Sequence, residues 1–295
     1  MGSLVALHSF AEKIFDCIYT FGDNLDTIDD FQVVTRRINQ LLQLKEEYKD
    51  NYLYDLNGNI IFSNVSIYVS NQTILKNINF IINQGDNVAI IGDNGSGKSI
   101  LAKTILGFYK YDGNIYINNH NIKRMNKEDI RKYVELILGE TYMFSGSILE
   151  NVKLDKEIEK DILEKIVKNC DIKDDIDKFK DGYNTLVGEK GTKLSGGQKQ
   201  RIAIVRSLIS NKPILILDEA LNKLDNKTRS NILTNLTNYY KNKTIIFISN
   251  NLEIINYVDT IIYIEGKTTV SGSHSELMAK NTNYKRLIEI NENVI

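Results

Sequence analysis

The chain has 295 residues, of which 42% are hydrophobic and 25% charged, and its formal net charge is −1. This length can bury a full core, and the near-neutral charge gives no general attraction to DNA, RNA or anionic lipid, so we expect no nucleic-acid partner. Cys17 and Cys170 show no metal or redox spacing, which favours a reducing compartment. No stretch approaches the roughly 18–20 apolar residues of a membrane-spanning helix.

Residues 4–48 are the first predicted element, a helix with one apolar face. Apolar residues recur there at spacings that alternate between four and three, the period of a helix stripe. Two interpretations stay open: a helical cap packed on the main domain, or a helix cut from something longer. We assign residues 1–57 to this helical extension. The stripe consists of Leu7, Ala11, Ile14, Ile18, Phe21, Leu25 and Ile28.

From about residue 58, predicted strands and helices alternate along the chain. This order indicates a mostly parallel sheet that helices cover on both faces. Strands are predicted at 59–69, 74–83, 86–93, 113–122 (a pair), 213–220, 243–250 and 260–266. Helices are predicted at 95–109, 126–133, 155–180 and 251–257.

The glycine-rich segment 92–99 has the spacing of a phosphate-binding loop, with a predicted strand before it and a helix after it. Its glycines let backbone N–H groups point at phosphate oxygens, and the helix adds the positive end of its dipole. Lys98 can reach the β- and γ-phosphates, and the Ser99 hydroxyl can ligate Mg²⁺. The residues predicted to bind nucleotide here are Gly92, Asp93, Asn94, Gly95, Ser96, Gly97, Lys98, Ser99 and Ile100.

Two acids, Asp218 and Glu219, follow the apolar run 214–217. A buried strand that ends in two carboxylates is unfavourable unless a cation lies nearby. We therefore expect Asp218 to join the Mg²⁺ shell and Glu219 to polarise an attacking water as general base. The alternative is a helix N-terminus that favours acids, and the glycine loop upstream makes this alternative weaker.

A second anion site is predicted where Ser195, Gly196 and Gly197 open a helix. One chain does not need two phosphate sites for one γ-phosphate, whereas two chains facing head to tail do, each closing the nucleotide of the other. The segment from Leu194 to Gln198 matches the signature of ATP-binding cassette (ABC) transporters without a change, so the chain resembles that family.

The resemblance covers residues 58–295 and implies a nucleotide-binding domain. Segment 92–99 corresponds to Walker A, 214–219 to Walker B and Asp225 to the D-loop aspartate. The family implies an α/β P-loop NTPase fold with a mostly parallel sheet core, an antiparallel β subdomain and a helical subdomain, here with an N-terminal helical extension. It implies ATP and Mg²⁺ as ligands.

Three further segments, at 143–152, 185–191 and 272–277, resemble exporter-type cassettes. In such exporters the membrane helices precede the cassette, so residues 1–57 are similar to the end of a membrane-domain helix and its linker. The resemblance implies ATP hydrolysis that powers an exporter at the cytoplasmic face of the cell membrane. It implies as partners a second cassette, identical or different, and membrane-spanning domains.

Two departures from the family pattern fall among the predicted catalytic residues, which are Glu219, Lys98 and Asn250. The family has glutamine where this chain has Gly139, although the adjacent Glu140 could substitute after a small backbone shift. The family has histidine where this chain has Asn250, which can donate a hydrogen bond but carries no charge. These departures predict weakened hydrolysis, and the alternative function is a catalytically poor regulatory cassette of a heterodimeric exporter.

A third departure concerns the base of the nucleotide. The family stacks an aromatic side chain on adenine at the position of Val69, and Tyr68 stands one residue early. On a strand this offset turns the side chain to the other face unless a bulge intervenes. We keep both residues as predicted adenine contacts.

Overall fold

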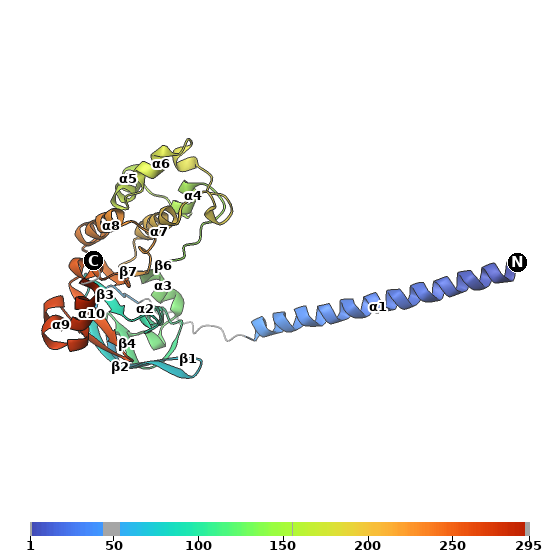
Figure 1. Ribbon diagram of the computed structural model, residues 1–295, viewed down its shortest axis with the longest axis horizontal. Coiled ribbons are helices and arrows are strands. Elements are labelled where there is room, and N and C mark those ends of the chain that lie inside the picture. Colours follow the sequence, from blue (N-terminus) through green and yellow to red (C-terminus); the bar gives the residue numbers. More distant parts are fainter. Residues whose placement is uncertain (1, 44–53, 155, 293–295) are drawn as a thin grey trace. The chain divides into compact units, whose positions relative to one another are not determined.

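The computed structural model describes residues 2–43, 54–154 and 156–292. The chain divides into two units, Met1–Glu47 and Tyr48–Ile295. The first unit contains helix α1 (Gly2–Leu42), and the second contains the other described elements (Figure 1). Helix α1 confirms the predicted helix as far as residue 42, and residues 44–48 of that prediction lie outside the described residues. The predicted boundary between residues 57 and 58 stays a prediction.

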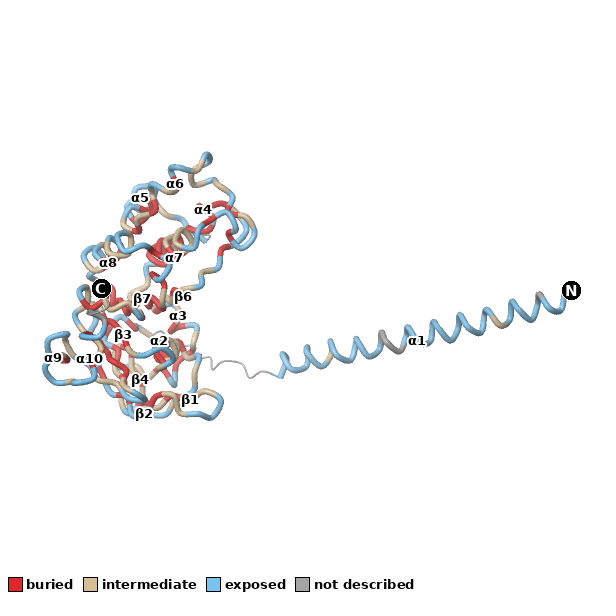
Figure 2. Tube along the Cα trace, viewed as in Figure 1, coloured by how far each residue is buried: buried red, intermediate tan, exposed pale blue. Residues whose placement is uncertain are grey.

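Helix α1 exposes the large apolar side chains of its predicted stripe for which burial is described (Figure 2). Leu7 is 74% exposed, Ile14 60% and Phe21 66%, so these side chains find no covering side chains within their own unit. Contiguous exposed apolar surface of this kind marks an interaction site in most folded proteins. Within the described ranges, no helix is both long and apolar enough to cross a membrane.

Two sheets form the second unit, and their topology confirms the predicted α/β class. The larger has the order β10-β9-β3-β8-β7-β6, with parallel pairing except between β9 and β10. The smaller is antiparallel, with the order β2-β1-β4-β5. The strands are β1 (Ile60–Val69), β2 (Gln72–Ile82), β3 (Asn87–Gly92), β4 (Lys110–Ile117), β5 (His120–Asn121), β6 (Val134–Leu138), β7 (Ile214–Asp218), β8 (Thr244–Ile248), β9 (Thr260–Glu265) and β10 (Thr268–Gly272).

Helices of the second unit cover the larger sheet, and α4 to α7 form a lobe of their own (Figure 1). The predicted helix at 155–180 is two helices, because Asp171 between them adopts a left-handed backbone with φ of 53°. Segment 251–257 is a 3₁₀ helix, Leu252–Tyr257. The α-helices are α2 (Lys98–Ile105), α3 (Lys127–Tyr133), α4 (Ile148–Lys153), α5 (Lys160–Asn169), α6 (Lys173–Lys178), α7 (Gly196–Ser210), α8 (Asn226–Tyr239), α9 (His274–Lys280) and α10 (Thr282–Glu292).

The inner strands β3, β7, β8 and β9 of the larger sheet are buried on both faces, because successive side chains of a strand point to opposite sides and both sets are apolar here. Ala89 and Phe247 belong to the core shared with α5, α7 and α8. Ile90 and Ile246 belong to the core shared with α2 and the antiparallel sheet. Polar groups are thereby confined to the strand ends, and the carboxyl ends of the parallel strands share one edge of the sheet.

We expect Phe247→Ala to lower the free energy of unfolding by about 3–5 kcal/mol, because it opens a cavity in the core of the sheet. Phe247 is 1% exposed. The matched control is Phe108→Ala, since Phe108 is 58% exposed and its loss should change stability by less than about 0.5 kcal/mol. Chemical denaturation of both variants measures the difference, and equal losses would contradict the assigned core.

Candidate nucleotide site

Strand order brings the predicted site residues to one edge of the larger sheet. Neighbouring parallel strands β6, β7, β8 and β3 end there. Gly139 follows β6, Glu219 follows β7, Asn250 lies two residues after β8, and the glycine loop begins at the end of β3. Segments far apart in the sequence therefore meet because parallel pairing aligns their carboxyl ends.

The glycine loop has the form of a phosphate cradle. Gly97 precedes α2 with φ of 100°, and a Cβ atom there would lie 2.9 Å from the Ile74 side chain. No side chain caps the N-terminus of α2, which leaves that helix end to a ligand. The Ser96 hydroxyl is buried and has no hydrogen-bond partner among the described residues. An unsatisfied buried hydroxyl is unfavourable, so the loop fits a polar ligand such as a phosphate.

Lys98 is held across this loop rather than extended into solvent. Its Nζ donates to the carbonyl oxygens of Gly92 and Asp93, each at 2.8 Å, and the residue is 6% exposed. Burial lowers the pKa of Lys98, while the negative charges of Glu219, Asp93 and Asp218 act in the opposite direction. A buried cation of this kind is placed to bind anionic oxygens.

Asp218, at the end of β7, interacts with two side chains through its carboxylate oxygens. The Ser99 hydroxyl donates to its Oδ1 at 2.6 Å, and Lys103 Nζ lies 3.3 Å from its Oδ2. A hydroxyl and a carboxylate are the oxygen ligands that Mg²⁺ prefers, so the predicted pair fits the ion. Sequence reasoning missed Lys103, although its position four residues after Ser99 on α2 puts both on one helix face.

Glu219 and Asn250 are in direct contact. Asn250 Nδ2 donates to Glu219 Oε1 at 3.1 Å. Glu219 has a left-handed backbone with φ of 55°, and its N–H donates to the Ile248 carbonyl at 3.0 Å, which ties it to β8. The structure thus joins the predicted general base to the residue that replaces the family histidine.

Gly139 lies too close to Glu219 to carry a side chain without movement. A Cβ atom at residue 139 would lie 2.9 Å from the Glu219 carbonyl oxygen and 3.3 Å from its Cβ. Gly139 and Glu219 line a cavity of about 480 Å³. The exposed Glu140 lines this cavity too, together with Ser99 and Asp218. The backbone at Gly139 therefore lies close to the backbone and Cβ of Glu219, the predicted general base.

The predicted adenine contacts lie at the end of β1. Pairing with β2 is irregular between Ile67 and Tyr68, which is where a bulge would be needed to turn Tyr68 to the other face. Tyr68 Oη nevertheless donates to Asp112 Oδ2 at 3.0 Å, a hydrogen bond that raises the pKa of Tyr68. This contact holds Tyr68 on the face of Asp112, and Val69 follows on the opposite face. Adenine contact by either residue stays a prediction.

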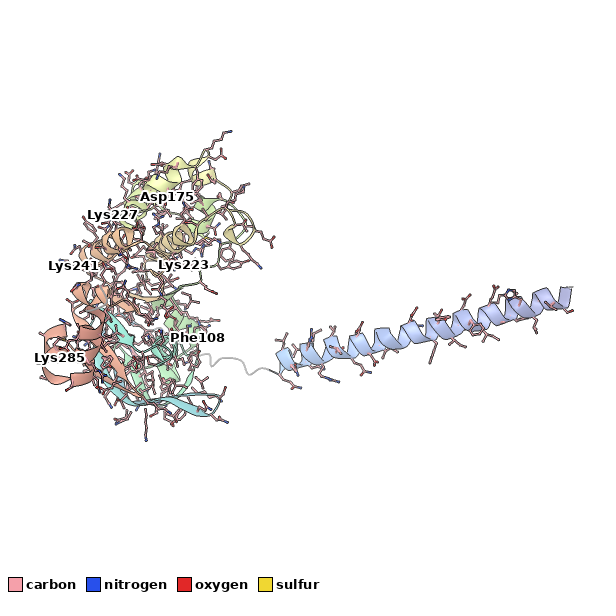
Figure 3. All side chains as sticks on the ribbon, in the orientation of Figure 1. Phe108, Asp175, Lys223, Lys227, Lys241 and Lys285 are labelled. Atoms are coloured by element: carbon pink, nitrogen blue, oxygen red, sulfur yellow. The ribbon has the colours of Figure 1, made fainter. Side chains whose placement is uncertain are left out.

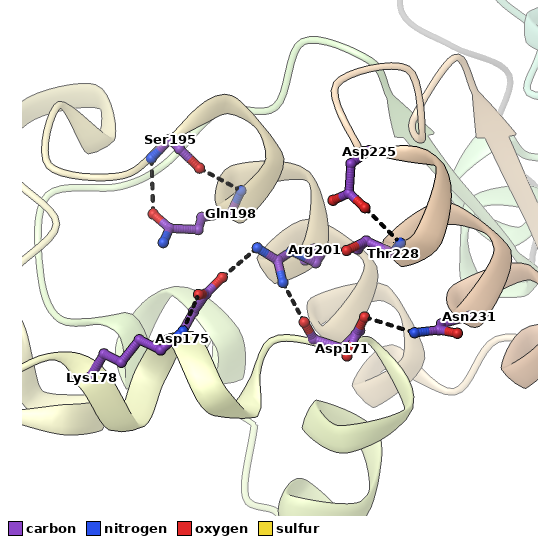
Figure 4. A network of polar contacts seen from close by, with 9 residues as sticks. All are labelled: Asp171, Asp175, Lys178, Ser195, Gln198, Arg201, Asp225, Thr228 and Asn231. Carbon is purple, nitrogen blue, oxygen red and sulfur yellow. Dashed lines mark hydrogen bonds and ion pairs between the residues drawn. The ribbon is translucent and has the colours of Figure 1, made fainter.

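The signature residues lie at the N-terminus of α7, apart from the glycine loop. Ser195 caps the helix by accepting from Gln198 N at 3.2 Å, and Gln198 Oε1 accepts from Ser195 N at 2.9 Å (Figure 4). Leu194 is buried. A Cβ atom at Gly197 would lie 3.2 Å from the carbonyl oxygen of Lys223. Figure 3 labels the residue Lys223. Close packing therefore joins the signature to the turn after β7.

Asp225 ends that turn as the cap of α8. It accepts from Thr228 N at 3.0 Å, and this backbone hydrogen bond lowers the pKa of the Asp225 carboxyl. Arg201 of α7 binds the Asp171 carbonyl and the Asp175 carboxylate in the same region (Figure 4). The helix opening of the second predicted anion site is thus capped by its own Ser195 side chain at the Gln198 N–H. Anion binding at Ser195, Gly196 and Gly197 stays a prediction.

The profile of the ABC transporter family matches residues 75–222, so the chain belongs to this family. It is an ATP-binding domain of the exporter type with an N-terminal helix. The pediocin PA-1 transport/processing ATP-binding protein PedD of Pediococcus acidilactici is 35% identical over 274 residues, or 88% of this chain and 37% of that protein.

The alpha-hemolysin translocation ATP-binding protein HlyB of Escherichia coli is 34% identical over 292 residues, 95% of this chain and 41% of the relative. A solved structure of a bacterial Atm1-family ABC exporter with ATP bound is 29% identical with a TM-score of 0.81, and covers 99% of this chain and 53% of that one. The chain therefore spans less than half the length of these curated relatives.

We expect Gly139→Gln to lower the free energy of unfolding by about 1–3 kcal/mol, because its Cβ must displace the Glu219 carbonyl. The same displacement should prevent the new amide from raising the rate of ATP hydrolysis. Chemical denaturation and phosphate release are the measurements, with Glu157→Gln as a control at an exposed residue outside the site. A stable and faster Gly139→Gln variant would contradict the close approach.

Proposed function

We propose that this chain binds and hydrolyses ATP with Mg²⁺ and so powers an exporter. The observation that supports this most is the meeting of the Ser99–Asp218 pair and Glu219 in one cavity beside the buried Lys98. These groups supply the separate parts that phosphoryl transfer requires: an anion cradle, a metal shell and a base.

Each residue has a distinct part in the proposed reaction. Backbone N–H groups of the loop and Lys98 bind the β- and γ-phosphates, and Lys98 exchanges its two carbonyl partners for phosphate oxygens. Ser99 and Asp218 hold Mg²⁺, which neutralises charge on the phosphates when it is bound. Glu219 accepts a proton from the attacking water, and Asn250 orients the Glu219 carboxylate.

The names of the relatives support the exporter as the machine that is powered. They describe pediocin transport, hemolysin translocation and an Atm1-family exporter. We infer a head-to-tail dimer with a second cassette, in which Ser195 and Asp225 face the partner's ATP, and membrane-spanning domains as further partners. The exposed apolar stripe of α1 is surface that such a domain would cover at the cytoplasmic face of the membrane.

We expect Lys98→Ala to abolish ATP hydrolysis and to weaken ATP binding, because no other described cation occupies the loop. Lys241→Ala is the matched control, an exposed lysine outside the nucleotide site. Calorimetric titration with Mg·ATP measures the affinities. Equal affinities of the Lys98→Ala variant and the wild-type chain would rule out the assigned loop.

We further propose that hydrolysis by this chain is slow, and a specific contact supports this. Asn250 Nδ2 donates to Glu219 Oε1, and its neutral amide brings none of the positive charge that a histidine can bring to the γ-phosphate. Gly139 contributes no side chain to the metal shell. The alternative function is a regulatory cassette that binds ATP beside a more active partner.

We expect Asn250→His to raise kcat by at least about tenfold, since one well-placed donor to a transition state commonly contributes 10²–10³. The affinity of the Asn250→His variant for ATP should change by a smaller factor than its kcat. Steady-state phosphate release measures kcat, with Asn250→Ala as the companion variant. If Asn250→His leaves kcat unchanged while Asn250→Ala lowers it, then Asn250 already supplies the needed contact and the slow-hydrolysis proposal fails.

A further inference from the structure

Gln200 is a buried amide on α7 that bridges two other segments. It is 1% exposed. Its Nε2 donates to the Gly139 carbonyl at 3.1 Å, and its Oε1 accepts from Lys223 N at 2.9 Å. Both ends of the amide are therefore satisfied by backbone groups from different parts of the chain.

Gly139 and Lys223, the two residues that Gln200 binds, each lie next to a different group of proposed site residues. Gly139 contacts Glu219 directly, because a Cβ at residue 139 would lie 2.9 Å from the Glu219 carbonyl. Lys223 lies in the turn between Glu219 and Asp225, and its carbonyl contacts Gly197 of the signature. Gln200 thus joins the chain's own base to the surface formed by the signature and Asp225.

A second set of contacts fixes the same segment to α7 farther along. Arg206 donates from Nη1 to the Tyr142 carbonyl at 3.2 Å and from Nε to the Asn151 carbonyl at 2.8 Å. Asn151, 1% exposed, exchanges hydrogen bonds with the backbone of Phe144 at 2.8 and 2.9 Å. Segment 139–144 is therefore held to α7 at both of its ends, and a shift of α7 shifts Gly139 as well.

We propose that Gln200 is a positioning residue that couples the nucleotide site of this chain to the surface that closes a partner's nucleotide. The inference rests on the proposed head-to-tail dimer. When a partner's ATP draws the signature end of α7 toward it, Gln200 moves Gly139 and Lys223 together, and Glu219 moves with them. Because residue 139 has no side chain, the link uses the backbone carbonyl of Gly139.

The test uses the full 295-residue chain. In a Glu219→Gln background, light scattering with and without Mg·ATP measures dimerisation, and with Glu219 intact, phosphate release measures kcat. Gln200→Met keeps the length of the side chain and removes both hydrogen bonds. Ser207→Ala is the control, a buried polar residue on the same helix whose hydroxyl donates to the Ala203 carbonyl of α7 at 2.9 Å.

We expect Gln200→Met to keep the ATP affinity of a single chain while it weakens dimerisation and lowers kcat, each by about 5- to 150-fold. Ser207→Ala should change neither. A purely structural role would lower stability and ATP affinity together. The inference is overturned if Gln200→Met dimerises and hydrolyses ATP as well as Ser207→Ala does. It is also overturned if Gln200→Met loses only ATP affinity.

Gln200→Glu keeps the test decisive if the Met variant does not fold. A protonated glutamate can still donate to Gly139 and accept from Lys223, whereas the carboxylate cannot donate. Its kcat relative to the wild-type chain at the same pH should therefore rise as the pH falls, and a constant ratio below one contradicts the link. If the Glu219→Gln chain binds ATP but never dimerises, the head-to-tail pairing of two copies of this chain is wrong, and the coupling inferred between them falls with it. If it dimerises and Gln200→Met has no effect, the coupling alone is wrong.

Discussion

Parallel pairing of β6, β7, β8 and β3 is the constraint on which the site depends. The inner strands β7, β8 and β3 are buried on both faces, so they are apolar along their lengths and carry polar groups only where they end. The carboxyl ends of parallel strands share one edge. Gly139, Asp218, Asn250 and the glycine loop meet there as a consequence of the sheet, without any direct link between them in sequence.

The charged side chains of Lys98 and Asp218 at that edge both have partners within the protein. The Lys98 ammonium has two carbonyl partners, and Asp218 has a hydroxyl and a lysine. Burying any of these groups without a partner would be costly, so the contacts hold the side chains in place before a ligand arrives. A bound nucleotide must then supply oxygen atoms that replace the present protein partners. For Lys98, phosphate oxygens would replace the two carbonyl oxygens.

Local patterns made much of this predictable from sequence. The glycine loop and the acids after 214–217 are contiguous patterns whose spacing predicts their chemistry, and the signature is assigned by its resemblance to the family. Contacts between distant segments were not predictable. Gln200 reaches Gly139 and Lys223 across three segments, and Tyr68 finds Asp112 on a neighbouring strand. The split of one predicted helix depends on a left-handed Asp171, a residue type that tolerates this backbone without requiring it.

The two departures from the family pattern acquire a shared meaning only in three dimensions. In sequence, Gly139 and Asn250 are separate losses, one of a metal contact and one of a charge. In the structure both contact Glu219: Asn250 through its amide, and Gly139 through the space that its missing side chain leaves for the Glu219 carbonyl. Residues that act on one neighbour couple rather than add. Restoring one family residue therefore acts on Glu219 while the other residue still contacts its backbone or its carboxylate, so the two positions form one unit around Glu219.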